Sequence, residues 1–127
     1  MPTPEKILII EDDAHVRELL ALQLEAAGFE CHQAGAAQSG IDAAVKLSPD
    51  AVLMDIQLPD SSGFQVCSTL RKRSKKMVLI MMTARFLMPE EKTQGFELGA
   101  DEYVTKPFDM AELTARIRQL LSRRQGT

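Results

Sequence analysis

Tryptophan is absent from the 127 residues, and aromatic residues make up only 5% of them. The one basic run, at residues 71–76, therefore has no aromatic side chains among its charges, and it lies where a helix should end. The formal net charge is −3, whereas binding to nucleic acid without regard to sequence requires a positive electrostatic field. We expect the run to be a solvated helix end, and the domain not to bind nucleic acid directly.

Long apolar runs are also missing, since no segment approaches the roughly 20 residues that a membrane-spanning helix needs. Residues 1–6 have neither the basic region nor the apolar stretch of a secretory signal. Cysteine is scarce, and Cys31 and Cys67 form no CxxC pair, so we expect reduced thiols that pack as small apolar side chains. These absences predict a cytoplasmic protein without membrane contact.

Short apolar runs alternate five times with segments that carry apolar residues at helical spacing. This alternation is typical of a parallel sheet with helices on both faces, so we predict an α/β domain of five βα units over residues 1–121. Residues 122–127 lose the pattern and are expected to be a C-terminal tail or the start of a linker. The predicted strands are Lys6–Ile10, Phe29–Ala34, Ala51–Met54, Met77–Met82 and Asp101–Val104.

The segments differ in apolar content. The second strand is the least apolar, so it should lie at an edge of the sheet. The fourth helix, expected to begin near Phe86, shows only a weak stripe through Phe96 and Leu98 and should pack marginally. The last helix has a strong apolar face, formed by Met110, Leu113, Ile117, Leu120 and Leu121.

Polar side chains follow four of the apolar runs at the point where each run ends. Because the C-terminal ends of parallel strands meet at one edge of an open α/β sheet, we expect these side chains to converge. Asp55 is the most informative of them, since a lone carboxylate directly behind a buried strand is a poor structural charge. The set is Glu11, Asp12, Asp55, Thr83 and Lys106.

Carboxylates a few ångström apart repel by roughly 4 kcal/mol per pair at an effective dielectric near 20, so the site should hold a cation. Oxygen ligands without histidine or cysteine favour Mg²⁺ or a similar hard ion such as Mn²⁺. Beside such an ion, Asp55 can act as a nucleophile and form an acyl phosphate, whose charge Lys106, the Thr83 hydroxyl and the Ala84 N–H would meet. An acidic pair that only caps the following helix is the simpler alternative.

Four segments carry a resemblance to a known family: Ile7–Asp13, Met54–Pro59, Met82–Arg85 and Gly99–Phe108. In this order they are similar to the receiver domain of response regulators in two-component (phosphorelay) signalling. The resemblance covers essentially the whole chain. It implies a doubly wound, flavodoxin-like (βα)5 fold with strand order 2-1-3-4-5. It also implies that Asp55 takes a phosphoryl group from a histidine kinase or a histidine phosphotransfer protein.

The same resemblance assigns the metal site and the residues that set the phosphate lifetime. Asp12, Asp55 and the main-chain carbonyl of Gln57 would hold Mg²⁺, with Glu11 acting mostly through water. Gln57 and Arg85 would flank the water that removes the phosphate. The domain would then catalyse only its own phosphorylation and a slow dephosphorylation, and would not be a turnover enzyme.

The resemblance further implies a switch and a cis peptide bond between Lys106 and Pro107. Thr83 would move toward the phosphate while Tyr103 turns inward. This movement would change the surface of the fourth helix, the fifth strand and the fifth helix, where an output domain or a partner protein docks. Mixed charge on this surface resembles the dimer face of transcription factors, so the charges are either the face of a homodimer formed on phosphorylation or ordinary surface charge. The charges are Lys92, Glu97, Asp101, Glu112, Arg116 and Arg118.

Two segments depart from the common pattern of the family. Ser61-Ser62 stands before Gly63 in place of the more usual methionine and aspartate, which should affect only helix capping. The segment Phe86–Gln94 is longer than in the commonest relatives and opens with apolar residues. These residues are either a partner-binding patch or side chains that pack beneath the strand.

Two functions from other classes share parts of this pattern. A haloacid-dehalogenase-type Mg²⁺ phosphatase also uses a strand-end aspartate, but it normally has a second aspartate two residues later, where this chain has Gln57. A flavodoxin-like FMN carrier would need a loop rich in Ser, Thr and Gly after the first strand. The acidic segment Glu11–Asp13 would instead repel a phosphate there.

Overall fold

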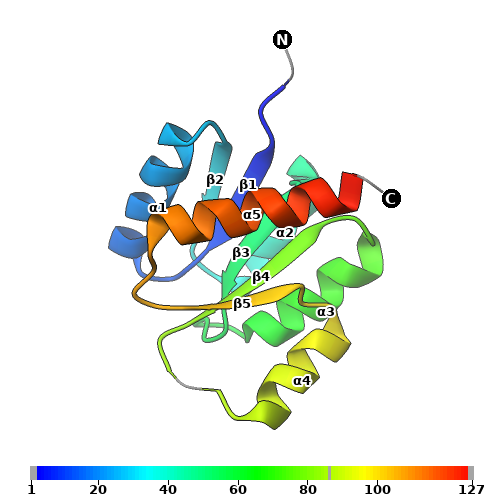
Figure 1. Ribbon diagram of the computed structural model, residues 1–127. Coiled ribbons are helices and arrows are strands. Elements are labelled where there is room, and N and C mark those ends of the chain that lie inside the picture. The colour runs from blue at the N-terminus through cyan, green and yellow to red at the C-terminus, as the bar shows by residue number, and fades with distance from the viewer. Residues whose placement is uncertain (1–2, 86, 126–127) are drawn as a thin grey trace.

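The computed structural model describes residues 3–85 and 87–125, which form five alternating βα units (Figure 1). The strands form one parallel sheet in the order β2-β1-β3-β4-β5, which confirms the predicted fold class. β2 lies at an edge, as its low apolar content predicted. The strands are β1 (Lys6–Ile10), β2 (Glu30–Ala34), β3 (Ala51–Asp55), β4 (Val78–Thr83) and β5 (Glu102–Thr105).

The predicted strand bounds are close to the observed ones, and the differences bear on the polar edge. β3 and β4 extend beyond their apolar runs to include Asp55 and Thr83. Asp55 is in register with Met82, and Thr83 with Thr105. Pairing between the strands therefore holds the backbone of both polar residues in place.

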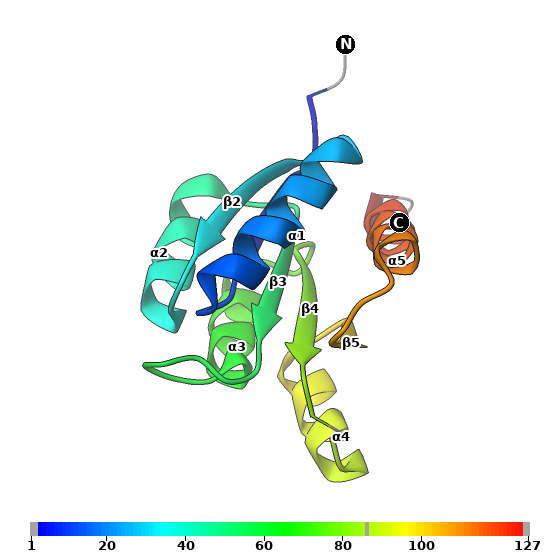
Figure 2. The ribbon, with the colours of Figure 1, turned by 90° about the vertical axis from the view of Figure 1, so that its left-hand side faces the viewer.

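Helices cover both faces of the sheet, so side chains that alternate along each strand enter two separate cores (Figure 2). Ile7 and Ile9 of β1 share a core with α1 and α5, whereas Leu8 and Ile10 share one with α2 and α3. β3 and β4 are buried along their whole length. The helices are α1 (Ala14–Ala26), α2 (Ala37–Leu47), α3 (Gly63–Arg73), α4 (Pro89–Leu98) and α5 (Met110–Gln125).

α4 begins later than the sequence predicted, at Pro89, whereas Phe86 lies outside the described residues. Met88 before it is extended, and proline suits the first turn of a helix because no backbone donor is needed there. Leu87 is buried and packs into the core, while Met88 is exposed. Gly95 alone is buried among the residues of α4, which confirms the expected marginal packing.

α5 has the strong apolar face that the sequence predicted, with Leu113, Ile117 and Leu121 buried in one core. The helix does not end with this face but continues to Gln125. Most of the segment 122–127, which we expected to be a tail or linker, is therefore helical as far as it is described. The division of the chain at residue 121 stays a prediction.

The basic run at residues 71–76 is solvated except at its first residue, where the expectation was wrong. The Arg71 guanidinium pairs with Asp101 at 2.8 Å and donates to the carbonyl of Gly99 at 2.7 Å. Its other acceptors are the carbonyl oxygens of Ser74, Lys75 and Met77. The planar fork of an arginine can serve several acceptors at once, so Arg71 ties the end of α3 to the start of β4 and to the α4–β5 turn.

The structure also bears on the expectations drawn from cysteine and from apolar runs. Cys67 is buried and Cys31 is half-buried, and neither is in a disulfide. Burial raises the pKa of each thiol to about 11, so both are protonated near neutral pH. In the part of the chain that the structure describes, no helix combines the length and the apolar character needed to cross a membrane.

Candidate functional site

The polar side chains that we expected to converge lie together at the edge where the strands end, toward which the arrowheads of β3 and β4 point (Figure 2). Glu11 follows β1, Asp55 and Thr83 end β3 and β4, and Lys106 follows β5. They line an open pocket of about 470 Å³. The pocket is completed by Asp12, Asp13, Val16, Gln57, Ala84 and Arg85.

Lys106 forms the central ion pairs of this pocket. Its ammonium lies 2.5 Å from a carboxylate oxygen of Asp55 and is also hydrogen-bonded to the carboxylate of Glu11. Burial opposes the charge of Lys106, but its hydrogen bonds to the two carboxylates outweigh burial and raise its pKa. Lys106 therefore stays charged beside Asp55. The peptide bond between Lys106 and Pro107 is cis, as predicted.

The acidic cluster has the donor set that a hard divalent cation requires. Glu11, Asp12 and Asp55 each offer a carboxylate oxygen, and these oxygens lie within 4.8 Å of one another. Glu11 is only 1% exposed, and burial, supported by the charge of Asp55, raises its pKa against the opposing bond from Lys106. A cation would relieve this cost, so the cluster fits the Mg²⁺ site of receiver domains.

Asp13 is part of the same acidic segment but has a different role. Its side chain accepts hydrogen bonds from the backbone N–H groups of His15 at 2.9 Å and Val16 at 3.2 Å. These bonds satisfy donors at the start of α1, so Asp13 is the N-cap of that helix. The capping alternative is thus correct for Asp13, while Glu11 and Asp12 face Asp55.

The Asp55 carboxylate is oriented by the loop that follows β3. The backbone N–H of Gln57 donates to it at 2.8 Å, which leaves its other oxygen for Lys106. Gly63, at the start of α3, lies against the backbone of Asp55, where a Cβ would collide with the carbonyl oxygen. The Ser62 side chain caps α3 by accepting from Gln65 at 3.2 Å, so the departure at Ser61-Ser62 retains an N-cap.

The Thr83 hydroxyl lies at the pocket but is bonded to the chain that follows it. It donates to the carbonyl oxygen of Arg85 and accepts from the N–H of Arg85, both at 3.1 Å. The Arg85 guanidinium pairs with Glu91 of α4 at 2.6 and 3.2 Å. Glu91 was not singled out from the sequence, because nothing in its local pattern separates it from Glu90.

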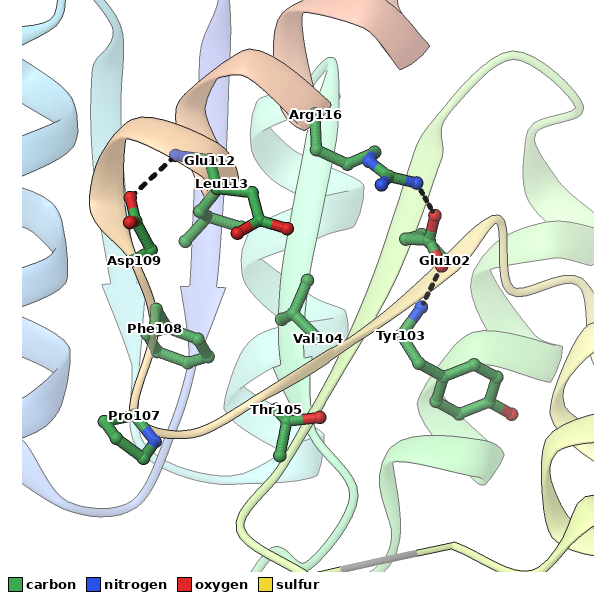
Figure 3. A pocket seen from close by; sticks show the side chains of 10 residues that line it. All are labelled: Glu102, Tyr103, Val104, Thr105, Pro107, Phe108, Asp109, Glu112, Leu113 and Arg116. Carbon is green, nitrogen blue, oxygen red and sulfur yellow. Dashed lines mark hydrogen bonds and ion pairs between the residues drawn. The ribbon is translucent and has the colours of Figure 1, made fainter.

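Tyr103 lies outside this pocket and points toward α4, away from the side chains of Phe108 and Leu113 (Figure 3). Its hydroxyl donates to the carbonyl oxygen of Lys92 at 3.1 Å and approaches that of Glu91 at 3.4 Å. Burial, with smaller contributions from nearby Cys67 and Glu91, raises the pKa of Tyr103 to about 12. The predicted switch residue is therefore half-buried against the helix that it was expected to influence.

A groove of about 380 Å³ lies between β5 and α5, beside Tyr103 (Figure 3). Arg116 crosses its rim and forms an ion pair with Glu102. Of the charges expected on a dimer face, Asp101 is engaged by Arg71, and Arg118 donates to the carbonyl of Ala27 at 2.6 Å. Several of these charges thus have partners within the chain.

Arg17 and Asp60 support the edge and were not predicted. The Arg17 guanidinium donates to the carbonyl oxygen of Glu11 at 2.7 Å, which fixes the backbone behind the acidic cluster. Asp60 accepts from the N–H groups of Ala37 at 2.7 Å and Gln38 at 3.0 Å. The same two bonds lower the pKa of Asp60, and they join the loop after β3 to the start of α2.

A parallel sheet of order 2-1-3-4-5, with an acidic cluster, a lysine and a strand-end threonine at one edge, defines a receiver domain. Residues 7–118 match the family described as response regulator receiver domain. The chain belongs to this family. The sequence pattern had identified the same family, so the phosphatase and flavin-carrier alternatives are set aside.

Named relatives and a solved structure agree with this assignment. The chain is 43% identical over 120 residues to the DNA-binding dual master transcriptional regulator RpaA of Synechocystis, covering 93% of the chain and 49% of that protein. It is 42% identical over 120 residues to the phosphate regulon transcriptional regulatory protein PhoB of Pseudomonas aeruginosa, covering 92% of the chain and 52% of that protein. The CheY-like receiver domain from Methanospirillum hungatei superposes with a TM-score of 0.93 at 27% identity, covering 98% of each chain. The chain thus spans about half the length of these curated relatives.

Proposed function

We propose that this domain accepts a phosphoryl group onto Asp55 from the phosphohistidine of a kinase or of a phosphotransfer protein. The observation that carries the proposal is the position of the Asp55 carboxylate, which contacts Lys106 and belongs to the acidic cluster that lines an open pocket. A carboxylate that only stabilised the fold would need neither acidic neighbours nor a place in the lining of an open pocket.

In the transfer, an Asp55 oxygen attacks phosphorus, the phosphorus–nitrogen bond of the donor breaks, and the histidine nitrogen leaves with the bonding electron pair. Asp12, Asp55 and the Gln57 carbonyl would hold Mg²⁺, with Glu11 acting mostly through water, and the ion supplies positive charge beside the phosphoryl oxygens. The Lys106 ammonium supplies a second positive charge at the same edge of the sheet.

The remaining donors come from the end of β4. The Thr83 hydroxyl and the backbone N–H of Ala84 would bond the phosphoryl oxygens. Water later attacks phosphorus, which releases inorganic phosphate and restores the carboxylate, at a rate that Gln57 and Arg85 tune. The domain therefore catalyses its own phosphorylation and slow dephosphorylation only. Both tuning residues line the pocket, which supports this assignment.

The output of the switch is proposed to leave the domain through α4, β5 and α5. Thr83 and Tyr103 each contact the α4 side of the molecule, Thr83 through Arg85 and Tyr103 directly. An attached output domain or a partner protein would read this surface, as would a second copy in a homodimer formed on phosphorylation. The relatives are regulators about twice as long, which supports an attached domain beyond the receiver at residues 1–121. We place the protein in the cytoplasm, where kinases of this class transfer phosphate.

Intact-mass measurement with a small acyl phosphate tests this proposal. The protein is expected to gain one phosphate with Mg²⁺, to gain none when the metal is chelated, and to gain none as Asp55→Ala. Asp42→Ala, which removes an exposed carboxylate from α2, is the matched control and should be phosphorylated like the wild type. A phosphate gain that persists in Asp55→Ala would contradict the assignment.

A further inference from the structure

Glu91 contacts both Arg85, in the loop after β4, and the hydroxyl of Tyr103. Its two carboxylate oxygens accept from the Arg85 guanidinium at 2.6 and 3.2 Å, and one of them also accepts the Met88 N–H at 3.0 Å at the start of α4. Its own carbonyl oxygen lies 3.4 Å from the Tyr103 hydroxyl. One residue in the first turn of α4 therefore reaches the loop after β4 and also the switch tyrosine.

Arg85 connects this residue to the phosphoryl pocket. Its backbone holds the Thr83 hydroxyl as both donor and acceptor, while its guanidinium pairs with Glu91 of α4. A Thr83 hydroxyl that turned to donate to a phosphoryl oxygen would have to release the Arg85 carbonyl. The loop at residues 83–85 is therefore held in an arrangement that differs from the phosphoryl-binding one.

We propose that Glu91 is a positioning residue that stabilises the unphosphorylated arrangement of Thr83 by holding Arg85 against α4. This inference rests on the proposed function, because it concerns the conformational step that follows phosphorylation of Asp55. The ion pair favours one of two arrangements of the loop, so its loss should favour the other.

The capping role of Glu91 can be separated from its charge. A glutamine at this position can still accept the Met88 N–H, so Glu91→Gln retains the cap and loses the ion pair. Glu90 lies in the same first turn and carries the same charge, but it is exposed. Glu90→Gln thus changes the net charge and the charge at the helix terminus equally, which makes it a matched control.

The test uses beryllofluoride, an analogue of the phosphoryl group, in the presence of Mg²⁺. Its affinity is measured from the change in Tyr103 fluorescence on binding. This residue is the sole tyrosine of a chain without tryptophan, so the signal has one source. An exposed ion pair shifts an equilibrium by about two- to fivefold, so Glu91→Gln is expected to bind beryllofluoride tighter by that factor. Glu90→Gln should bind it as the wild type does.

A double-mutant cycle provides the second measurement. In an Arg85→Gln background, Glu91→Gln should produce no further gain, because the partner is already lost. Equal affinities for Glu91→Gln and Glu90→Gln, or an undiminished gain in the Arg85→Gln background, would overturn the inference. A loss of thermal stability without a change in affinity would make Glu91 a structural residue only, and would overturn it as well.

Failure of the inference is distinguishable from failure of the proposed function. If wild-type protein neither binds beryllofluoride nor gains phosphate at Asp55, the proposed function is wrong and the inference falls with it. If the wild type binds and is phosphorylated but Glu91→Gln behaves as Glu90→Gln does, only the role of Glu91 is refuted.

Discussion

The ammonium of Lys106 lies 2.5 Å from a carboxylate oxygen of Asp55 and also bonds the carboxylate of Glu11. Lys106 thus joins the ends of β1, β3 and β5 at one point. If Asp55 accepts a phosphoryl group as proposed, the lysine is already in place, so little reorganisation would be needed when charge develops there. This pairing leads to a first prediction.

Lys106→Ala should fold but respond weakly to phosphorylation. A charge-assisted hydrogen bond contributes roughly 1.5–3 kcal/mol, so beryllofluoride affinity should fall about tenfold or more. Titration of the Tyr103 fluorescence measures this affinity. Lys46→Ala, which removes an exposed charge from α2, should leave it unchanged. A Lys106→Ala protein with the wild-type response would refute the role given to this lysine.

Gly95→Ala should displace Tyr103. A methyl group at Gly95 would collide with the Tyr103 hydroxyl, which is bonded to the first turns of α4. Alanine normally stabilises a helix by roughly 0.5–1 kcal/mol relative to glycine, so a loss of stability here would be due to the collision.

The readout for Gly95→Ala is the phenol pKa of Tyr103, measured by ultraviolet absorbance. It should fall from about 12 toward the ordinary value of 10.0, because the ring leaves its half-buried position. Gln94→Ala, at the exposed neighbouring position, is the control and should keep the raised pKa. The packing of Tyr103 against α4 would be disproved by an unchanged phenol pKa in Gly95→Ala.

Arg71→Ala should destabilise the fold by about 2–4 kcal/mol, because it leaves half-buried carbonyl groups without this donor and removes the ion pair with Asp101. Urea unfolding measures this change. Arg73→Ala removes the same charge from an exposed position of the same helix and should change stability by less than about 0.5 kcal/mol. Equal effects of the two substitutions would show that Arg71 is only a surface charge.

The Arg85–Glu91 ion pair gives a pH-dependent contribution to stability with a defined sign. The hydrogen bond from Arg85, aided by the Met88 N–H, lowers the pKa of Glu91 from 4.5 to about 2. A lowered pKa means that the contribution is present above pH 4.5 and is lost as the pH falls toward 2. The free energies of unfolding of wild type and Glu91→Gln should therefore differ at neutral pH and become equal as the pH falls toward 2. A constant difference across this range would contradict the ion pair.

The strands and the pocket residues could be predicted because the signals are local, whereas the order of the strands came from the resemblance to receiver domains. Asp55, Thr83 and Lys106 each follow an apolar run, and parallel topology places such positions at one edge. The N-cap role of Asp13 is equally local, since the backbone N–H groups that donate to it lie two and three residues away. Such features depend on neighbouring residues and on strand direction alone.

The supporting residues could not be predicted because their partners are distant in sequence. Arg71 bonds Gly99, 28 residues away, and Arg17 bonds Gln33, 16 residues away. Most acceptors of Arg71 are backbone carbonyls, which carry no residue-type signal. Glu91 resembles Glu90 until the turn before α4 brings Arg85 to it. The partners of these long side chains therefore become evident only from the tertiary structure.

The central claim is that Asp55 is the residue that carries the phosphate, and borohydride trapping tests it most directly. After treatment with an acyl phosphate and Mg²⁺, reduction converts an aspartyl phosphate to homoserine, which peptide mass spectrometry locates. We predict homoserine at position 55 and at no other carboxylate. Homoserine at position 12 instead, or a phosphorylated protein without homoserine at position 55, would contradict the account.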